Sequence, residues 1–181
     1  MDKVIVFLAD GFEEIEALTV VDVLRRGGVD VSTVSIMDRL NVMGAHNIEV
    51  KADMLFDIEE NSKADMLVLP GGGVGTQNLK EHGGVNGLCA RFAEDGKYVT
   101  AICAAPSVLG VKGLLKGKCA VCYPGFEPQL EGAEIGSDKV VTDGKFITSK
   151  GPGTAADFAL TLLAVIKGQD TADKVRAGML L

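Results

Sequence analysis

The sequence predicts an α/β protein with a doubly wound, mostly parallel sheet and helices on both faces. Short apolar runs typical of buried strands alternate with segments of helical periodicity along the 181-residue chain. The chain is 47% hydrophobic and contains 23 glycines, a composition that suits a buried parallel sheet with small residues in its loops. No repeat period or Pro/Ser-rich linker divides it, so we expect residues 1–181 to form one domain.

The first half of the chain opens as a β-α-β unit, whose parallel crossover is expected to be right-handed. The predicted elements are strand Lys3–Leu8, helix Glu13–Arg26, strand Val29–Ile36, a short antiparallel excursion over 42–56 and strand Met66–Leu69. The last strand ends abruptly at Pro70-Gly71-Gly72-Gly73. An apolar strand followed by a run of glycines favours a loop at the carboxyl edge of the sheet.

The second half continues the alternation of strands and helices. The predicted elements are helix Val85–Glu94, strand Tyr98–Ile102, helix Ala104–Leu109, strand Cys119–Tyr123, a hairpin of Lys139–Thr142 with Lys145–Thr148, and helix 155–167. Asp143-Gly144 is a strong two-residue hairpin signal. Thr154 with Asp157 resembles a capping box that opens the last helix.

Charge and composition exclude several classes of function. The formal net charge is −7, which disfavours contact with a nucleic-acid backbone. The apolar run Val4–Ala9 is too short for a signal-peptide core or a membrane span, so we expect a cytoplasmic protein with no membrane partner. The two histidines, His46 and His82, have no neighbour at metal-ligand spacing, so no metal is expected. Gly71-Gly72-Gly73-Val74-Gly75 lacks the Lys-Ser/Thr of a P-loop, and we predict no cofactor.

Cys103 is the strongest chemical signal in the sequence. It follows a predicted strand directly, in Ala101-Ile102-Cys103-Ala104-Ala105-Pro106. A nucleophile on a sharp strand-to-helix elbow needs small residues two positions before and after it, as Ala101 and Ala105 are here. The helix N-terminus is expected to lower the pKa of the thiol. The backbone N–H groups of Ala104 and Gly72 are candidate donors to an oxyanion.

Alternatives remain open for the neighbouring residues. Spacing alone weighs a reactive Cys103 about evenly against a buried structural thiol, and the glycine-rich loop favours reactivity. Glu13, Glu14 and Glu16 all begin the first helix, and periodicity does not choose between Glu13 and Glu16. A solvated acid that complements the helix dipole is the simpler interpretation of each one.

The remaining thiols are expected to play no chemical role. Cys89 lies in an apolar helix and is assigned to the core. Cys119 and Cys122 lie three apart on a predicted strand, so they point to opposite faces and are badly placed for a disulfide.

Several ordered motifs resemble one known family. They are Gly11-Phe12-Glu13-Glu14-Ile15-Glu16, Asp22-Val23-Leu24-Arg25-Arg26-Gly27-Gly28, Leu69-Pro70-Gly71-Gly72, Gln77-Asn78-Leu79, Ala101-Ile102-Cys103-Ala104-Ala105-Pro106 and Thr148-Ser149-Lys150-Gly151-Pro152-Gly153-Thr154. On these motifs the chain is identified as a member of the ThiJ/PfpI superfamily, in the branch of the Parkinson's-linked protein deglycase DJ-1 and bacterial YajL.

The resemblance implies a flavodoxin-like fold, a homodimer and an oxidation-sensitive nucleophile at Cys103. It selects Glu16 as the protonated acid that hydrogen-bonds the thiolate, with Gly72 and Ala104 as backbone donors. It also places Tyr123 where the human relative has a histidine near the cysteine. Tyrosine is a poor general base at neutral pH, so any rate that depends on that histidine is in question.

These residues lead to two functional hypotheses. The first is a glyoxalase or deglycase, a lyase or hydrolase that acts on a small dicarbonyl such as methylglyoxal or on a glycated protein. The second is a redox-sensing protein of the oxidative-stress response, or a chaperone, with little turnover. Peptidase activity is not expected, because the protease branch has a histidine at the position of Ala104 and no histidine follows Cys103. A thiazole-biosynthesis role has no support in these residues.

Overall fold

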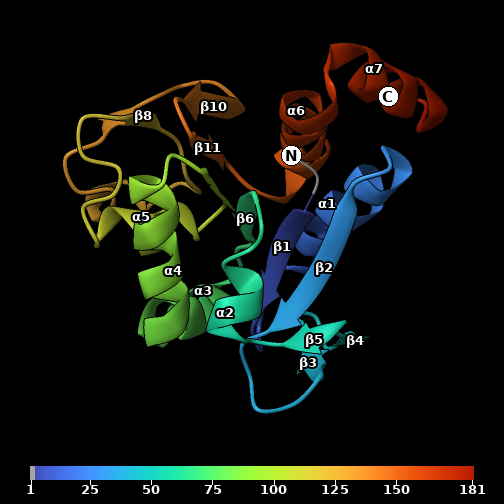
Figure 1. Ribbon diagram of the computed structural model, residues 1–181. Coiled ribbons are helices and arrows are strands. Elements are labelled where there is room, and N and C mark those ends of the chain that lie inside the picture. The colour runs from blue at the N-terminus through green and yellow to red at the C-terminus, as the bar shows by residue number, and fades with distance from the viewer. Residues whose placement is uncertain (1–2) are drawn as a thin grey trace.

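A seven-stranded sheet forms the centre of the computed structural model, which describes residues 3–181 (Figure 1). The strand order is β10-β11-β7-β6-β1-β2-β5, and only the β10–β11 pair is antiparallel. The strands are β1 (Lys3–Leu8), β2 (Asp30–Ser35), β5 (Met54–Leu55), β6 (Met66–Leu69), β7 (Tyr98–Ile102), β10 (Val140–Asp143) and β11 (Phe146–Ser149). The doubly wound, mostly parallel fold is therefore confirmed.

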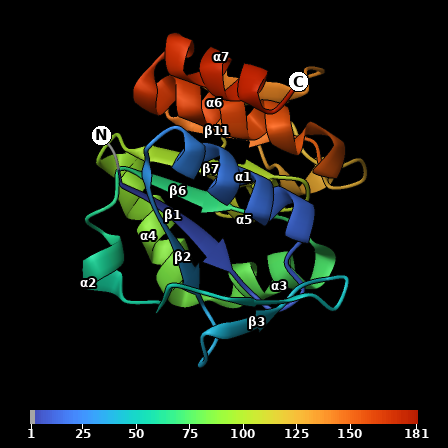
Figure 2. The same ribbon diagram turned by 90° about the vertical axis from the view of Figure 1, so that its right-hand side faces the viewer.

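Helices cover both faces of the sheet, as Figures 1 and 2 show. One layer consists of α1 (Glu14–Arg26), α6 (Ala155–Lys167) and α7 (Gln169–Gly178). The other consists of α2 (Ile58–Asn61), α3 (Gly73–Glu81), α4 (Gly83–Glu94) and α5 (Pro106–Gly110).

The alternation of side chains along β1 explains why both layers are needed. Val4, Val6 and Leu8 pack in the apolar cluster that includes α1 and α6. Ile5 and Phe7 point the other way, into the cluster that includes α4 and α5. The side chains of both sets, on the two faces of β1, are fully buried, so their sequence is one continuous apolar run, which is typical of a central parallel strand.

The antiparallel excursion is shorter than predicted. β3 (Asn41–Met43) and β4 (Glu49–Lys51) pair in antiparallel fashion. The rest of the segment, β5, instead joins the central sheet in parallel with β2. The prediction for 42–56 is thus correct only for its first part.

The predicted strand Cys119–Tyr123 is wrong over most of its length. Only β8 (Cys119–Ala120) is extended, and it pairs in parallel with β9 (Glu134–Ile135), outside the central sheet. In the hairpin of β10 and β11, Asp143 pairs with Phe146. The turn residues are therefore Gly144 and Lys145 instead of the predicted Asp143 and Gly144.

Several helix predictions also need correction. The expected helix Ala104–Leu109 begins only at Pro106, while α3 and α7 were not predicted at all. The capping box is not formed, because the Thr154 hydroxyl hydrogen-bonds Ser149 and Gly151 instead. Within residues 3–181, no helix combines the length and apolar character needed to cross a membrane.

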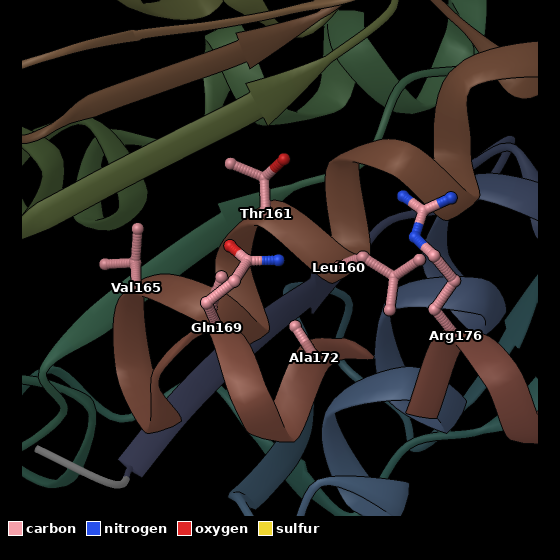
Figure 3. Close-up of a pocket in the computed structure, with 7 residues that line it drawn as sticks. Leu160, Thr161, Val165, Gln169, Ala172 and Arg176 are labelled. Atoms are coloured by element: carbon pink, nitrogen blue, oxygen red, sulfur yellow. The ribbon is translucent and has the colours of Figure 1, made fainter. Parts of the chain in front are cut away.

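A cavity of about 370 Å³ lies between α6 and α7 (Figure 3). Its walls include Leu160, Thr161 and Ala172, with the side chains of Gln169 and Arg176 at its rim. Arg176 is already paired with Asp157 at 3.3 Å. The lining residues carry neither a thiol nor a carboxylate.

Candidate active site

The loops that follow β1, β6 and β7 lie at the same edge of the sheet. These three strands are neighbours, and all run in the same direction. Backbone hydrogen bonds connect the loops: Glu13 N–H donates to Gly71 O at 3.0 Å, and Gly75 N–H donates to Gly11 O at 3.1 Å. Ligands bind at this edge in open parallel sheets.

Cys103 has the strained backbone expected of a nucleophile elbow. Its φ angle is 65°, in the left-handed region that few residues other than glycine adopt. Its N–H donates to Ser149 O at 2.9 Å, and its carbonyl accepts from Tyr123 N–H at 2.7 Å. Ala101 and Ala105 are fully buried on either side. Hydrogen bonds from two distant segments therefore hold the turn that presents the thiol.

The predicted helix N-terminus at the thiol is absent. Helix α5 begins at Pro106 and has only five residues, so its dipole is small and lies beyond the turn. Two individual N–H groups take its place. The backbone N–H groups of Gly72 and Ala104 both donate hydrogen bonds to the Cys103 sulfur. These are the two donors that the sequence suggested.

The two glycines of the β6–α3 loop allow this close approach. Gly72 has a φ of 91°, and a Cβ atom there would lie 2.2 Å from the carbonyl oxygen of Gly11. A Cβ on Gly71 would lie 2.5 Å from the Cβ of Cys103. Any larger residue at either position would push the loop away from the sulfur.

Glu16 is the acid that contacts the thiol. Its side chain is completely buried, and its Oε2 accepts a hydrogen bond from Gly71 N–H at 2.7 Å. It also hydrogen-bonds Cys103. Its other oxygen, Oε1, has no hydrogen-bond partner among the described residues. The structure thus brings Glu16, and not Glu13, into contact with the sulfur.

Glu16 and Cys103 form a coupled pair that disfavours two negative charges. Burial is the main reason that the pKa of Glu16 rises to about 7. Burial and the neighbouring Glu16 carboxylate raise the pKa of Cys103 to about 12, against the opposing effect of the two N–H donors. The lowered pKa expected for Cys103 is therefore wrong, because burial has the largest effect and raises the pKa, and the Glu16 carboxylate raises it further. A protonated Glu16 removes the repulsion and can donate to a thiolate.

A cavity of about 270 Å³ opens onto the sulfur. It is lined by Glu13, Gly72, Gly73, Cys103, Ala104, Tyr123, Phe126 and Pro152. Tyr123 lies in this wall, as the sequence suggested, with 47% of its surface exposed. Phe126 and Pro152 were not predicted to line the site, although Pro152 stands inside a motif quoted above. Glu13, which periodicity left open as an alternative to Glu16, lines the cavity without contacting the sulfur as Glu16 does.

The three glutamates that begin helix α1 are all buried, against the expectation of solvated acids. Glu14 accepts hydrogen bonds from the backbone N–H of His46 at 2.7 Å and from its Nδ1 at 2.8 Å. Glu13 lies 3.7 Å from the same Nδ1. The turn between β3 and β4 covers this end of the helix, a contact with no sequence signal.

The other cysteines are thiols, as predicted. Cys89 is buried in α4, where burial raises its pKa to about 12, so it belongs to the core. Cys119 and Cys122 form no disulfide.

The model of the DJ-1/PfpI family matches residues 2–165 of the sequence. The chain belongs to this family. DJ-1 homolog B of Arabidopsis thaliana is 38% identical over 181 residues, which cover 99% of this chain and 41% of that protein. The chain thus spans less than half of this relative. It matches 96% of dj-1beta of Drosophila melanogaster at 35% identity over 98% of its own length.

Solved structures of DJ-1 proteins confirm the flavodoxin-like fold. Oxidized DJ-1 of Toxoplasma gondii superimposes with a TM-score of 0.94 at 36% identity, covering 99% of this chain and 98% of that one. Drosophila DJ-1beta gives a TM-score of 0.92 at 34% identity, with coverage of 99% and 98%. The resemblance inferred from the motifs is therefore confirmed at the level of family and fold.

Proposed function

We propose that this DJ-1/PfpI protein is a cofactor-free, cysteine-dependent enzyme of the cytoplasm. Its substrates would be reactive dicarbonyls such as methylglyoxal, or their early adducts with proteins. The observation that supports this best is the environment of the Cys103 sulfur, which contacts two backbone N–H groups and a buried carboxyl group at the base of a small cavity.

The proposed reaction begins when the Cys103 thiolate adds to the aldehyde carbon. The carbonyl oxygen takes up the negative charge next to the N–H groups of Gly72 and Ala104, and then a proton, to give a hemithioacetal. Glu16, ionised once it has given its proton to that oxygen, removes the proton of the former aldehyde carbon and returns it to the neighbouring carbon. The hydroxyl proton of the hemithioacetal passes to the neighbouring carbonyl oxygen, which leaves a thioester of lactate. Water hydrolyses the thioester, so that methylglyoxal and water yield lactate and the free thiol returns.

The pKa of Glu16 suits this role. General acid–base catalysis is most efficient when the pKa of the group lies near the working pH, and that of Glu16 is raised to about 7. A carboxyl group in contact with the sulfur can therefore move protons without a histidine in the cavity. Tyr123 then has the lesser task of orienting the substrate.

One relative supports this class of activity. A protein of Thermococcus kodakarensis named as a deglycase is 31% identical over 153 residues, which cover 83% of this chain and 91% of that protein.

Turnover of methylglyoxal to lactate, without added thiol, tests the proposal. We expect activity in the wild type and a loss of at least about 100-fold in Cys103→Ala and Glu16→Ala. Cys89→Ala is the matched control, because that thiol is buried in α4, away from the cavity. Undiminished turnover by Cys103→Ala would exclude the mechanism.

The alternative function is redox sensing, with peroxide as the oxidant of Cys103. The N–H groups of Gly72 and Ala104, together with a protonated Glu16, would stabilise a sulfinate. The solved Toxoplasma DJ-1 relative is described as oxidized. Mass spectrometry after mild peroxide treatment distinguishes the two functions: an inactive wild type whose Cys103 oxidises ahead of Cys89, Cys119 and Cys122 would favour sensing.

We also propose that the chain forms a homodimer through an apolar surface on α1 and the β3–β4 hairpin. Ile15 and Leu18 are exposed on one side of α1 by 55% and 37%, and Met43 and Ile48 on the hairpin by 38% and 53%. Ile15 and Ile48 line the same shallow cavity, which places the two elements side by side. A contiguous apolar surface of this kind favours a protein partner.

A further inference from the structure

We propose that Glu13, Glu14 and His46 form a binding site for a divalent transition-metal cation such as Zn²⁺. One carboxylate oxygen from each glutamate and a ring nitrogen of His46 lie within 4.8 Å of one another. Imidazole nitrogen with carboxylate oxygen is a ligand set that zinc and its neighbours in the periodic table accept. The proposal does not depend on the dicarbonyl chemistry of Cys103.

The turn that carries His46 is fixed against the start of α1. Gly11 N–H donates to Met43 O at 2.7 Å, and Ala45 N–H donates to Phe12 O at 2.8 Å. Asn47 has a φ of 62° and closes the turn with a hydrogen bond from its N–H to Gly44 O at 3.2 Å. The cluster is therefore assembled by backbone geometry from two segments about thirty residues apart.

The two carboxylates are held in place by burial. Only 5% of Glu14 is exposed, and a Cβ on Gly44 would lie 2.2 Å from its Oε1, so the carboxylate rests directly on the turn. Glu13 is 9% exposed, and within residues 3–181 no hydrogen-bond donor reaches its carboxylate. Among the described residues, the only charged partner of Glu13 is His46 Nδ1 at 3.7 Å, so a single histidine balances two buried carboxylates, and a bound cation would balance them more fully.

The distances suit a small ion. Nδ1 of His46 lies 2.8 Å from Glu14 Oε2 and 3.7 Å from Glu13 Oε2. A tetrahedral Zn²⁺ with bonds of about 2.0–2.1 Å separates its ligand atoms by about 3.3–3.4 Å. The two separations from Nδ1 lie on either side of this value, and all three ligand atoms lie within 4.8 Å of one another, so the side chains would have to close around the ion.

The charges also suit a divalent ion. Among the described residues, no lysine or arginine pairs with Glu13 or Glu14, and His46 is their only basic neighbour within 4 Å. Two carboxylates with a protonated histidine leave one net negative charge. A divalent cation that replaces the proton on Nδ1 brings the cluster to neutrality. The three ligands leave a fourth position for water on the side where His46 is exposed.

Glu13 connects this site to the Cys103 cavity. Its side chain lines that cavity and also a second one, of about 230 Å³, formed with Glu14, Ile15, His46 and Ile48. A cation bound here would place positive charge in the wall beside the reactive sulfur, where it would attract anionic substrates.

Calorimetric titration of the full chain with Zn²⁺ tests the proposal, with circular dichroism to confirm folding. We expect one ion per chain in the wild type and binding at least about 10-fold weaker in His46→Ala and in Glu14→Gln. His82→Asn is the matched control: it removes the other histidine and keeps an oxygen acceptor at that helix N-cap. Cys103→Ser separates this site from zinc bound to the thiol.

The site is supported if His82→Asn and Cys103→Ser still bind one Zn²⁺ while His46→Ala and Glu14→Gln lose it. No binding by the wild type, equal binding by His46→Ala, or loss in Cys103→Ser overturns it. Anomalous scattering from crystals soaked in Co²⁺ gives a second readout, with a peak expected between the three side chains.

Discussion

At the scale of single residues, reactivity depends on where one proton lies. Glu16 and Cys103 are in contact in a buried setting, where burial disfavours either charge and their repulsion disfavours both together. Burial favours the protonated carboxyl group of Glu16, whereas the hydrogen bond from Gly71 N–H to Oε2 favours the ionised form, and burial has the larger effect. The protonation state of Glu16 therefore bears on stability and, in the proposed mechanism, on the chemistry.

The first prediction concerns the pH dependence of stability. The pKa of Glu16 rises from 4.5 to about 7 on folding, so the folded chain binds more protons than the unfolded chain between these values. The free energy of unfolding then falls as pH rises through this window. The free energy of unfolding of Glu16→Gln should not show this fall. Relative to the wild type, it should therefore rise by roughly 2–3 kcal/mol when the pH is raised from 5 to 8. Denaturant unfolding at both pH values measures this.

Glu131→Gln serves as the control, because Glu131 is exposed. Its stability difference from the wild type should stay constant over the same range. A constant difference for Glu16→Gln as well would mean that the carboxyl group is not held in its neutral form.

The second prediction concerns Tyr123, which lines the cavity at the position of the family histidine. An imidazole titrates near neutral pH and can move protons that a phenol cannot. We expect Tyr123→His to raise kcat for methylglyoxal by at least about 10-fold. Tyr123→Phe should stay within a few-fold of the wild type, since only the hydroxyl is lost. Equal rates for Tyr123→His and the wild type would show that Glu16 already performs the proton transfers.

At the scale of elements, the β6–α3 turn sets the distance between backbone donors and sulfur. Gly72 has a left-handed φ and no room for a side chain, whereas Gly73, the next residue, has open space where a Cβ would stand. The two neighbours thus make a matched pair for mutation.

The third prediction is that Gly72→Ala lowers the free energy of unfolding by about 2 kcal/mol or more, through strain and the collision with Gly11 O. Gly73→Ala should leave stability unchanged or raise it by up to about 1 kcal/mol, because Gly73 begins a helix. Thermal and denaturant unfolding provide the comparison. Equal losses in the two variants would contradict the geometry described for the turn.

The central strands could be predicted from the sequence because a strand buried on both faces consists of a continuous run of apolar residues. β1, β6 and β7 have the predicted bounds. Helix α3 was missed because its sequence, GVGTQNLKE, begins with glycines and lacks an apolar stripe. The strand predicted at β8 was too long, because an apolar segment buried in a loop has the same sequence pattern as a buried strand.

The site itself could be predicted only in part. Cys103 is visible from its own neighbours in the sequence, but the choice of Glu16 came from the family resemblance. Its contact with Gly71 joins residues 55 positions apart, which periodicity cannot show. The cluster at His46 was missed for the same reason: its ligands come from two segments that only the tertiary fold brings together.

At the scale of the whole molecule, the apolar surface on α1 and the β3–β4 hairpin borders the glutamates that line the site. Association through this surface would bury Ile15 and Ile48 and restrict movement of the hairpin that carries His46. The proposed dimer would therefore stabilise the wall of the site as well as its own interface.

The fourth prediction tests the dimer. Ile48→Asp introduces a charge at the centre of the proposed interface. We expect sedimentation velocity to show a shift from dimer to monomer, with a dissociation constant of the dimer at least about 10-fold higher. Ile58→Asp is the control, since Ile58 is 45% exposed and begins helix α2, outside the surface defined here. A wild type that sediments as a monomer, or an Ile48→Asp variant that remains a dimer, would contradict the proposal.

The hydrogen bond from Cys103 N–H to Ser149 O has a consequence for the order in which the protein becomes reactive during synthesis. The acid that contacts the thiol lies near the start of the chain, whereas the carbonyl that holds its backbone lies in β11, near the end. A ribosome-bound chain has made the cysteine well before it has made the strand that fixes the turn. A chain without β11 lacks both the strand that pairs with β7 and the carbonyl that accepts the hydrogen bond from Cys103 N–H. One of the two backbone hydrogen bonds that hold the turn at Cys103 can therefore form only after β11 has been made.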